Sequence, residues 1–213
     1  MGPETGVKIV FHYDAGPELT RRLDDLAAEG LDVEVCRVTD RQRFEACMKD
    51  VEVIWHVLEP ITADVIAAAP RLRLIQKIGV GVNTIDVDAA RERGVCVCNM
   101  PGTNTRAVAE ATLGLMLAAL RRLPFFDAAT RRGEGWAWTP EVQDELGELG
   151  GRRVGLVGYG AVPRALAPML HALDASVLYT DLRPIADAVG EFCGLEELLA
   201  RSDLVSLHVP LTP

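Results

Sequence analysis

Apolar and polar positions alternate along this chain with two periods that follow one another in turn. Short apolar or strictly alternating runs predict strands, and longer segments with apolar residues three or four apart predict helices. The predicted strands cover residues 7–11, 33–38, 51–57, 72–78, 95–98, 154–157, 176–179 and 204–208. The predicted helices cover residues 19–29, 41–49, 62–69, 105–120, 163–173 and 195–200. This βαβα alternation implies parallel sheets covered by helices on both faces, which is an α/β fold.

Proline and glycine divide these elements into two groups. Pro101 and Gly102 interrupt the pattern after the first five predicted strands, and such a pair marks a turn or a loop. We therefore predict two α/β domains in series, at residues 1–100 and 101–213.

Two segments of the second half have a distinctive character. The helix at 105–120 carries apolar residues around most of its surface, which predicts burial between layers or between subunits. Pro124 is expected to end this helix. The segment 133–151 is glycine-rich and acidic and contains Trp136 and Trp138, so we expect a loop lying over the surface.

A strand–glycine–helix motif begins at residue 154. The loop between the strand and the helix reads Gly158-Tyr159-Gly160-Ala161-Val162-Pro163. In dinucleotide sites the first glycine permits a tight turn, the second lets backbone N–H groups approach the pyrophosphate, and the helix N-terminus supplies positive potential. Asp181 ends the next strand about 20 residues further on, where a carboxylate accepts hydrogen bonds from the adenosine ribose. The motif predicts a dinucleotide site.

Two prolines depart from this motif. Pro163 stands in place of the third glycine, but a proline in the first helical turn removes an N–H group that has no intrahelical partner. Ala161 and Val162 are then expected to supply the amides that face the phosphates. Pro168 lies deeper in the helix and crowds the carbonyl of Arg164, so we predict a bend there.

Composition and charge narrow the class of protein. The 213 residues are 49% hydrophobic and 25% charged, as in ordinary soluble globular proteins. A net charge of −9 without a basic stripe disfavours nucleic-acid binding. The N-terminus lacks the pattern of a signal peptide, and the most apolar stretch, 107–120, is too short and too polar to span a bilayer.

The cysteines indicate a reducing compartment and no metal site. Their positions are Cys36, Cys47, Cys96, Cys98 and Cys193, without C-x-x-C spacing. Cys96 and Cys98 alternate along one strand and so point to one face. A metal or redox pair is one interpretation of this geometry, but small buried apolar side chains are the favoured one. We therefore expect a cytoplasmic protein with no metal.

Three segments together resemble the D-isomer-specific 2-hydroxyacid dehydrogenases, a family that includes phosphoglycerate, glyoxylate and D-lactate dehydrogenases. They are Gly79-Val80-Gly81-Val-Asn-Thr-Ile-Asp86; Gly94 to Glu110, with Asn-Met-Pro-Gly-Thr-Asn104 at its centre; and the Gly158 loop with Asp181 and Ser202-Asp-Leu-Val-Ser-Leu-His208-Val209-Pro210. The order and spacing match from about residue 51 to residue 213. The resemblance implies a flavodoxin-like substrate domain, the first half of a Rossmann NAD-binding domain, and a homodimer formed through the helix at 105–120.

The resemblance also implies roles for particular residues. Glycines at 79 and 81, with Val80 between them, let backbone N–H groups reach a substrate carboxylate. Asn104 is expected to lie at the substrate, and its position also suits capping of the following helix. His208, Val209 and Pro210 are expected along the adenine and ribose.

The cofactor expected from these residues is NAD. Asp181 would repel the 2′-phosphate of NADP, whereas Arg183 nearby could accommodate that phosphate. NAD is favoured because the carboxylate of Asp181 precedes Arg183 along the chain.

The sequence departs from the family pattern at the substrate. His56 and Val57 stand where phosphoglycerate dehydrogenases often carry Arg-Ser, so a phosphate-bearing substrate would lose a permanently charged partner. This departure argues against 3-phosphoglycerate, and it leaves the substrate side group open.

The family's catalytic Arg and its His–Glu pair come after the segment that ends this sequence. We therefore expect a C-terminal truncation, with no catalytic residue in this chain and no activity of the chain as given. The missing half of the sheet is also expected to leave the strand at 154–157 as an open, apolar edge.

Three functional hypotheses remain. The first is an NAD-dependent oxidoreductase that transfers hydride between nicotinamide and a small 2-hydroxy or 2-oxo acid. The second is a non-catalytic NAD-binding scaffold or corepressor-like module. The third is an unrelated Rossmann protein such as a methyltransferase, which the Gly79 loop and the Asn104 segment disfavour.

Overall fold

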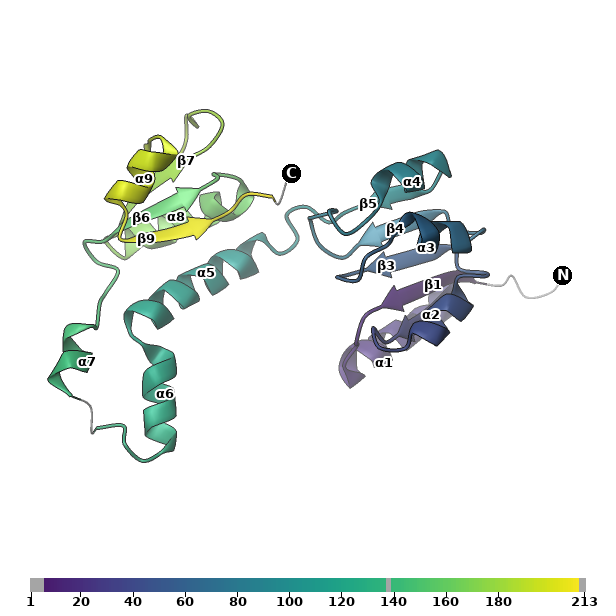
Figure 1. Cartoon of the computed structure of the whole chain (residues 1–213), viewed down its shortest axis with the longest axis horizontal. Coiled ribbons are helices and arrows are strands. Elements are labelled where there is room, and N and C mark those ends of the chain that lie inside the picture. The colour runs from purple at the N-terminus through teal and green to yellow at the C-terminus, as the bar shows by residue number, and fades with distance from the viewer. Residues whose placement is uncertain (1–5, 137–138, 211–213) are drawn as a thin grey trace. The chain divides into compact units, whose positions relative to one another are not determined.

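The computed structural model describes residues 6–136 and 139–210, in which two α/β units follow one another along the chain (Figure 1). The first unit ends at Thr103, and the second runs from Asn104 to Pro210. Each unit has its own parallel sheet and its own buried cluster of apolar side chains. The predicted α/β class with parallel sheets is therefore confirmed.

Among its described residues, the first unit forms a five-stranded parallel sheet. Its elements are β1 (Val7–His12), α1 (Pro17–Asp25), a short 3-10 helix (Leu26–Glu29), β2 (Leu31–Cys36), α2 (Arg41–Cys47), β3 (Val53–His56), α3 (Ala63–Ala68), β4 (Leu74–Lys77), α4 (Val87–Glu92) and β5 (Cys96–Cys98). The strands lie in the order β2-β1-β3-β4-β5. This is the strand order of flavodoxin-like folds.

The core of the first unit lies on the face of the sheet that α2 and α3 cover. Val10, Ile54 and Ile75 come from β1, β3 and β4, and each is at most 4% exposed. They belong to one cluster with Phe44 of α2 and Ile66 of α3. Burial of such side chains contributes about 1.5–3 kcal/mol each, so this face holds the unit together.

The second unit forms a four-stranded parallel sheet among its described residues. Its elements are α5 (Thr105–Leu120), α6 (Leu123–Arg131), α7 (Pro140–Asp144), β6 (Arg153–Val157), α8 (Ala161–Ala172), β7 (Ser176–Thr180), β8 (Glu191–Phe192), α9 (Leu195–Arg201) and β9 (Leu204–Leu207). The order is β8-β7-β6-β9. Ala109 and Met116 of α5 share a core with Leu166 and Leu170 of α8 and with Leu156 of β6.

Every strand and helix predicted from the hydrophobic pattern occurs in the structure. Their observed ends differ from the predicted ends by a few residues. The helix at 105–120 has the predicted bounds. The pattern missed α4, α7 and β8, which are short or lie within the segment interpreted as loop, and it missed α6, which follows the turn at Arg122. Trp136, in that segment, is 95% exposed, whereas Trp138 lies outside the described residues.

Of two predictions about α5, the one about Pro124 is wrong, and burial between layers or between subunits stays a prediction. Only Ala109 and Met116 of the helix are buried, and Leu115 is 71% exposed, because one side packs on α8 and the other carries apolar side chains into solvent. Pro124 does not end the helix, which stops at Leu120. It lies instead in the first turn of α6, after Arg122 has reversed the chain with φ +50°.

Two further predictions are corrected by the strand order and by exposure. Strand β6 is not an edge, because β7 and β9 flank it. The edge strands of the described sheet are β8 and β9, and Leu207 of β9 is 73% exposed. Cys96 and Cys98 are exposed rather than buried, because they lie on the edge strand β5.

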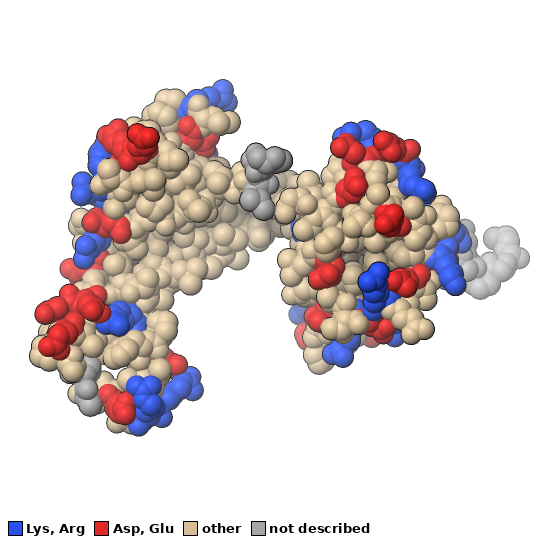
Figure 2. All heavy atoms as spheres, viewed as in Figure 1, with Lys and Arg blue, Asp and Glu red and all other residues tan. Residues whose placement is uncertain are grey.

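The surface is mixed in charge. Figure 2 shows acidic and basic side chains interspersed over the visible face of each unit. Within the described part of the chain, no helix is long and apolar enough to cross a membrane, and no group of His, Cys, Asp and Glu side chains could hold a metal ion.

Candidate functional site

The loop after β6 is shaped by its first glycine. Gly158 has φ +89°, and its N–H group donates to the carbonyl of Thr180 at 2.8 Å. A Cβ at this position would lie 2.6 Å from the carbonyl oxygen of His208. Only glycine fits this close approach of two backbones.

The second glycine leaves open space in front of helix α8. Nothing lies within 4 Å of a Cβ position built on Gly160, and α8 begins at the next residue. The amides of Ala161 and Val162 point out of the first turn, as helix geometry requires. Pro163 is the third helical residue, and the first intrahelical bond comes from Arg164 N–H to the Gly160 carbonyl at 3.1 Å. A proline is therefore accommodated here, and the start of the helix retains donors for an anion.

Asp181 lies beside this loop and immediately after β7. Its carboxylate accepts the N–H groups of Tyr159 and of Leu182, each at 2.7 Å. These two backbone donors, Tyr159 first, lower the pKa of Asp181 and keep it ionised. Each carboxylate oxygen has a second lone pair, so the group can still accept hydrogen bonds from hydroxyls of a ligand.

Tyr159 fixes the loop rather than facing outward. Its ring is buried and lies 4.4 Å from that of Tyr179, centroid to centroid. Its hydroxyl donates to the Val189 carbonyl at 2.9 Å and accepts from the Val189 N–H at 2.8 Å. Tyr159 thus ties the segment after Asp181 to the glycine loop.

The residues after β9 complete this edge. His208 N–H donates to the Val157 carbonyl at 2.8 Å, and the side chain of Val209 lies 3.0 Å from the Cβ position of Gly158. Burial lowers the pKa of the His208 imidazole, so the ring is neutral at pH 7. The structure therefore brings the 158–162 loop, Asp181 and residues 208–209 together at one end of the sheet, with the exposed Pro210 following them.

The predicted carboxylate cradle lies in the first unit, directly after β4. Gly79 has φ +150°, and the N–H groups of Gly79, Val80 and Gly81 donate to no acceptor among the residues that the structure describes. Their carbonyls are held instead, since Met100 N–H donates to the Gly79 carbonyl at 2.8 Å and the Asn99 amide donates to that of Val80 at 2.9 Å. The loop therefore offers free backbone donors on an ordered frame.

Asn104 does not cap α5. It precedes the helix, but its side chain makes no capping hydrogen bond, and the residue is exposed. The capping role considered for it is wrong, because φ −113° and ψ 9° at this position differ from the extended backbone of an N-cap.

Near the cradle lie two titratable side chains that the sequence analysis did not identify as neighbours. His56 and Lys77 are partners in the register of β3 and β4 and are at most 8% exposed. The Nε2 atom of His56 donates to the Glu59 carbonyl at 2.7 Å, and Nζ of Lys77 donates to the Val57 carbonyl. A lysine within the apolar run Leu74-Ile-Gln-Lys77-Ile was the available signal.

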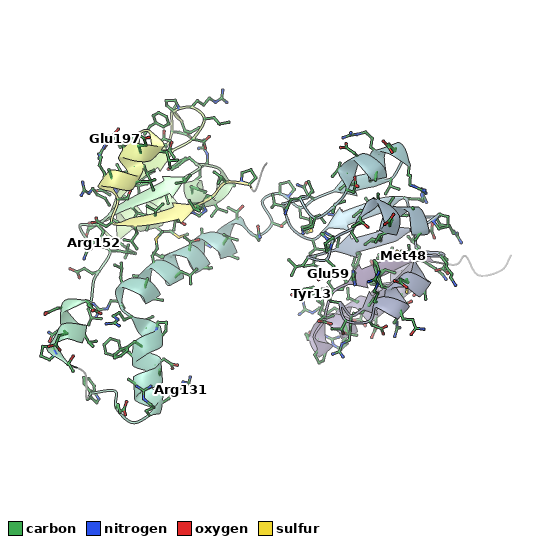
Figure 3. All side chains as sticks on the ribbon, viewed as in Figure 1. Tyr13, Met48, Glu59, Arg131, Arg152 and Glu197 are labelled. Atoms are coloured by element: carbon green, nitrogen blue, oxygen red, sulfur yellow. The ribbon has the colours of Figure 1, made fainter. Side chains whose placement is uncertain are left out.

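A separate pocket of about 630 Å³ lies between α2 and α3. Met48 and Glu59, labelled in Figure 3, are among the residues that line it. None of the predicted site residues lines this pocket.

Comparison with known proteins gives a consistent result. The family model described as the catalytic domain of D-isomer specific 2-hydroxyacid dehydrogenases matches residues 9–182. A D-3-phosphoglycerate dehydrogenase of Mycobacterium tuberculosis is 36% identical over 195 residues, covering 88% of this chain and 36% of that protein. A glyoxylate reductase of Thermofilum pendens is 41% identical over 180 residues, covering 81% of this chain and 52% of that protein.

A solved structure is similar over almost the whole chain. The TT0316 protein of Thermus thermophilus has a TM-score of 0.85 and 36% identity, and the likeness covers 97% of this chain and 66% of that one. This chain spans between about a third and about half of the length of the two curated relatives.

Proposed function

The chain belongs to the D-isomer specific 2-hydroxyacid dehydrogenase family, and we propose that it binds NAD at the Gly158 loop and the carboxylate of a small 2-hydroxy or 2-oxo acid at the Gly79 loop. The observation that carries the proposal is the cradle itself. Gly158 and Gly160 clear space before α8, and the ionised Asp181 stands beside it.

The described residues fit the cofactor. The amides of Ala161 and Val162 suit the pyrophosphate, because the helix N-terminus carries positive potential. Asp181 suits the hydroxyls of the adenosine ribose and disfavours a 2′-phosphate. When bound, the nicotinamide would supply or accept hydride at the carbon that bears the oxygen of the acid.

In the first unit, the free N–H groups of Gly79, Val80 and Gly81 would hold the acid's carboxylate and fix its orientation. The resemblance places the family's catalytic Arg and His–Glu pair after the segment that matches residues 204–212. We therefore expect this polypeptide to bind NADH without oxidising it, because the residues that the resemblance assigns to proton transfer are not among those described.

Titration with NADH and NADPH, followed by nicotinamide fluorescence, tests the cofactor proposal. We expect saturable NADH binding that is about tenfold tighter than NADPH binding, since a carboxylate opposes the extra phosphate. Asp181→Ala should reduce this discrimination. Asp187→Ala, which removes an exposed carboxylate paired with Arg164, is the matched control and should not. Tighter binding of NADPH by the wild-type chain would contradict the proposal.

We further propose that the protein is a cytoplasmic homodimer. Exposed Val108 and Leu115 leave an apolar side of α5 in solvent, and such surfaces mark interaction sites. The cysteines are free thiols, as expected in a reducing compartment.

A further inference from the structure

The pocket between α2 and α3 lies where open α/β sheets commonly bind ligands. Strands β2 and β3 flank β1 on opposite sides, so the order in which the chain fills the sheet reverses beside β1. In flavodoxin-like sheets, ligands bind outside the carboxyl ends of the strands at this reversal. His12, the last residue of β1, and Glu59 and Pro60, which follow β3, line the pocket. Its volume of about 630 Å³ suits a small molecule.

A stacked pair of rings forms one side of this pocket. The imidazole of His12 lies on the ring of Phe44 of α2, with centroids 3.9 Å apart and planes 17° from parallel. Both residues are at most 7% exposed. Met48, which follows α2, and Val65 of α3 add apolar surface to the lining. A ligand with a flat apolar body would therefore remove apolar area from water on binding here.

The His12 side chain also carries a polar atom that the fold leaves without a partner. Its Nδ1 atom is buried and forms no hydrogen bond with any residue that the structure describes. Burial lowers the pKa of this imidazole, although the carboxylates of Glu59 and Asp14 act in the opposite direction, so the ring is neutral at pH 7. A buried polar atom without a hydrogen bond opposes folding, and a phenylalanine would stack on Phe44 without this cost. The nitrogen therefore points to a ligand that donates a hydrogen bond.

The charges around the pocket favour a cation. Arg41 is the one basic residue of the lining among the described residues besides the neutral His12, and it is paired with Glu45 at 2.9 Å. Glu59 and Asp64 also line the pocket, and neither forms an ion pair within the described part of the chain. The backbone at Glu59 is fixed, because its carbonyl contacts Nε2 of the buried His56 at 2.7 Å. Two carboxylates without a counter-ion attract a cation and repel an anion.

We propose that this pocket binds a small organic ammonium ion with a flat apolar body, of the class of arylalkyl amines. The apolar body packs beside the rings of His12 and Phe44. The ammonium donates to Nδ1 of His12 and lies close to the carboxylate of Glu59. The site belongs to the first unit alone and shares no residue with the Gly158 loop or the Gly79 loop, so it does not depend on the proposed function.

Calorimetric titration of the whole chain with three indoles tests the preference for a cation. Tryptamine carries an ammonium, tryptophol carries a neutral hydroxyl in its place, and indole-3-propionate carries a carboxylate. We expect saturable binding of tryptamine that is about tenfold or more tighter than binding of tryptophol, and weaker binding still of indole-3-propionate. Tryptophol or indole-3-propionate binding as tightly as tryptamine, or no binding of tryptamine, overturns the proposal.

The histidine side chains report where the amine binds. The four histidines of the chain are His12, His56, His171 and His208. In protein labelled with 15N-histidine, the ring signals of His12 are assigned by their loss in His12→Phe. We expect tryptamine to shift the Nδ1 signal of His12 and to leave the signals of His171 and His208, in the second unit, unchanged. Saturable binding without a shift at His12 overturns the proposal.

Charge variants separate recognition of the ammonium from burial of the ring. The double variant Glu59→Gln, Asp64→Asn should weaken tryptamine binding about tenfold or more and leave tryptophol binding unchanged. The double variant Asp88→Asn, Glu92→Gln is the matched control, because it removes two carboxylates of α4 that do not line the pocket. It should bind both indoles as the wild type does.

The His12→Phe variant tests the hydrogen bond, because it retains a ring on Phe44 and removes the acceptor. We expect it to weaken tryptamine binding about tenfold. If this variant does not fold, the charge variants still decide the matter. Wild-type affinity for tryptamine in the Glu59→Gln, Asp64→Asn variant overturns the proposal, and so does equal weakening in the control.

Discussion

The two glycines of the loop after β6 have different physical tasks. Gly158 combines φ +89° with a Cβ position only 2.6 Å from the His208 carbonyl oxygen. Gly160 has φ −77° and open space around its Cβ position. The fold thus requires the first glycine but not the second, whose open space suits the proposed cofactor.

We predict that Gly158→Ala lowers the free energy of unfolding by about 2–4 kcal/mol, since left-handed backbone and a backbone clash both oppose a side chain. Gly160→Ala should change that free energy by less than about 0.5 kcal/mol and weaken NADH binding by about tenfold or more, because its methyl group enters the pyrophosphate space. Urea unfolding and NADH titration measure the two effects. Equal losses of stability would contradict the division of tasks.

Single residues also show where sequence reasoning ends. The glycine loop and Asp181 could be predicted because their spacing along the chain defines the turn and the strand end. The apolar run around Lys77 signals its burial, but its contact with the Val57 carbonyl could not be predicted, because that contact depends on β3 and β4 becoming neighbours. Such a contact between separate strands has no local signature.

At the scale of elements, helix α8 contains an interior proline that its fold does not need. Pro168 is exposed, so its ring fills no cavity. It removes the hydrogen bond that residue 168 would donate to the Arg164 carbonyl, and an interior proline costs about 3 kcal/mol or more.

We predict that Pro168→Ala raises the free energy of unfolding by about 1–3 kcal/mol, because the restored bond outweighs the greater freedom of the unfolded chain, which costs up to about 1 kcal/mol. Urea unfolding followed by circular dichroism measures the gain. Pro163→Ala is the control: that N–H group lies in the first turn, and the ring is buried, so no gain is expected. A gain in the control but not in Pro168→Ala would refute this account.

The elements that sequence patterns located are those with a strong apolar period, such as α5. The missed ones have physical reasons. Helix α4 spans six residues and β8 two, which is too few to establish a period. Helix α6 depends on Arg122 adopting φ +50°, a conformation that an arginine does not signal. Pro124 therefore looked like the end of one helix when it lies at the start of another.

At the scale of the whole molecule, the two units have separate cores. A ligand that binds one unit should therefore slow amide hydrogen exchange in that unit only. NADH at 100 times its dissociation constant stabilises the state that binds it by about 2.7 kcal/mol. If the second unit opens as its own cooperative block, exchange of its most protected amides in β6 and β7 should slow about 100-fold. Amides of β1 and β3 in the first unit should be unaffected.

Hydrogen exchange of the whole chain, with and without NADH, measures this distribution. Gly160→Ala provides the control, since a chain that folds but binds NADH poorly should show little slowing at the same concentration. Slowing in both units would mean that they unfold as one block, and slowing in the first unit alone would place the cofactor away from the Gly158 loop. Either result contradicts the prediction, because the strand ends that form the proposed NAD cradle all belong to the second unit.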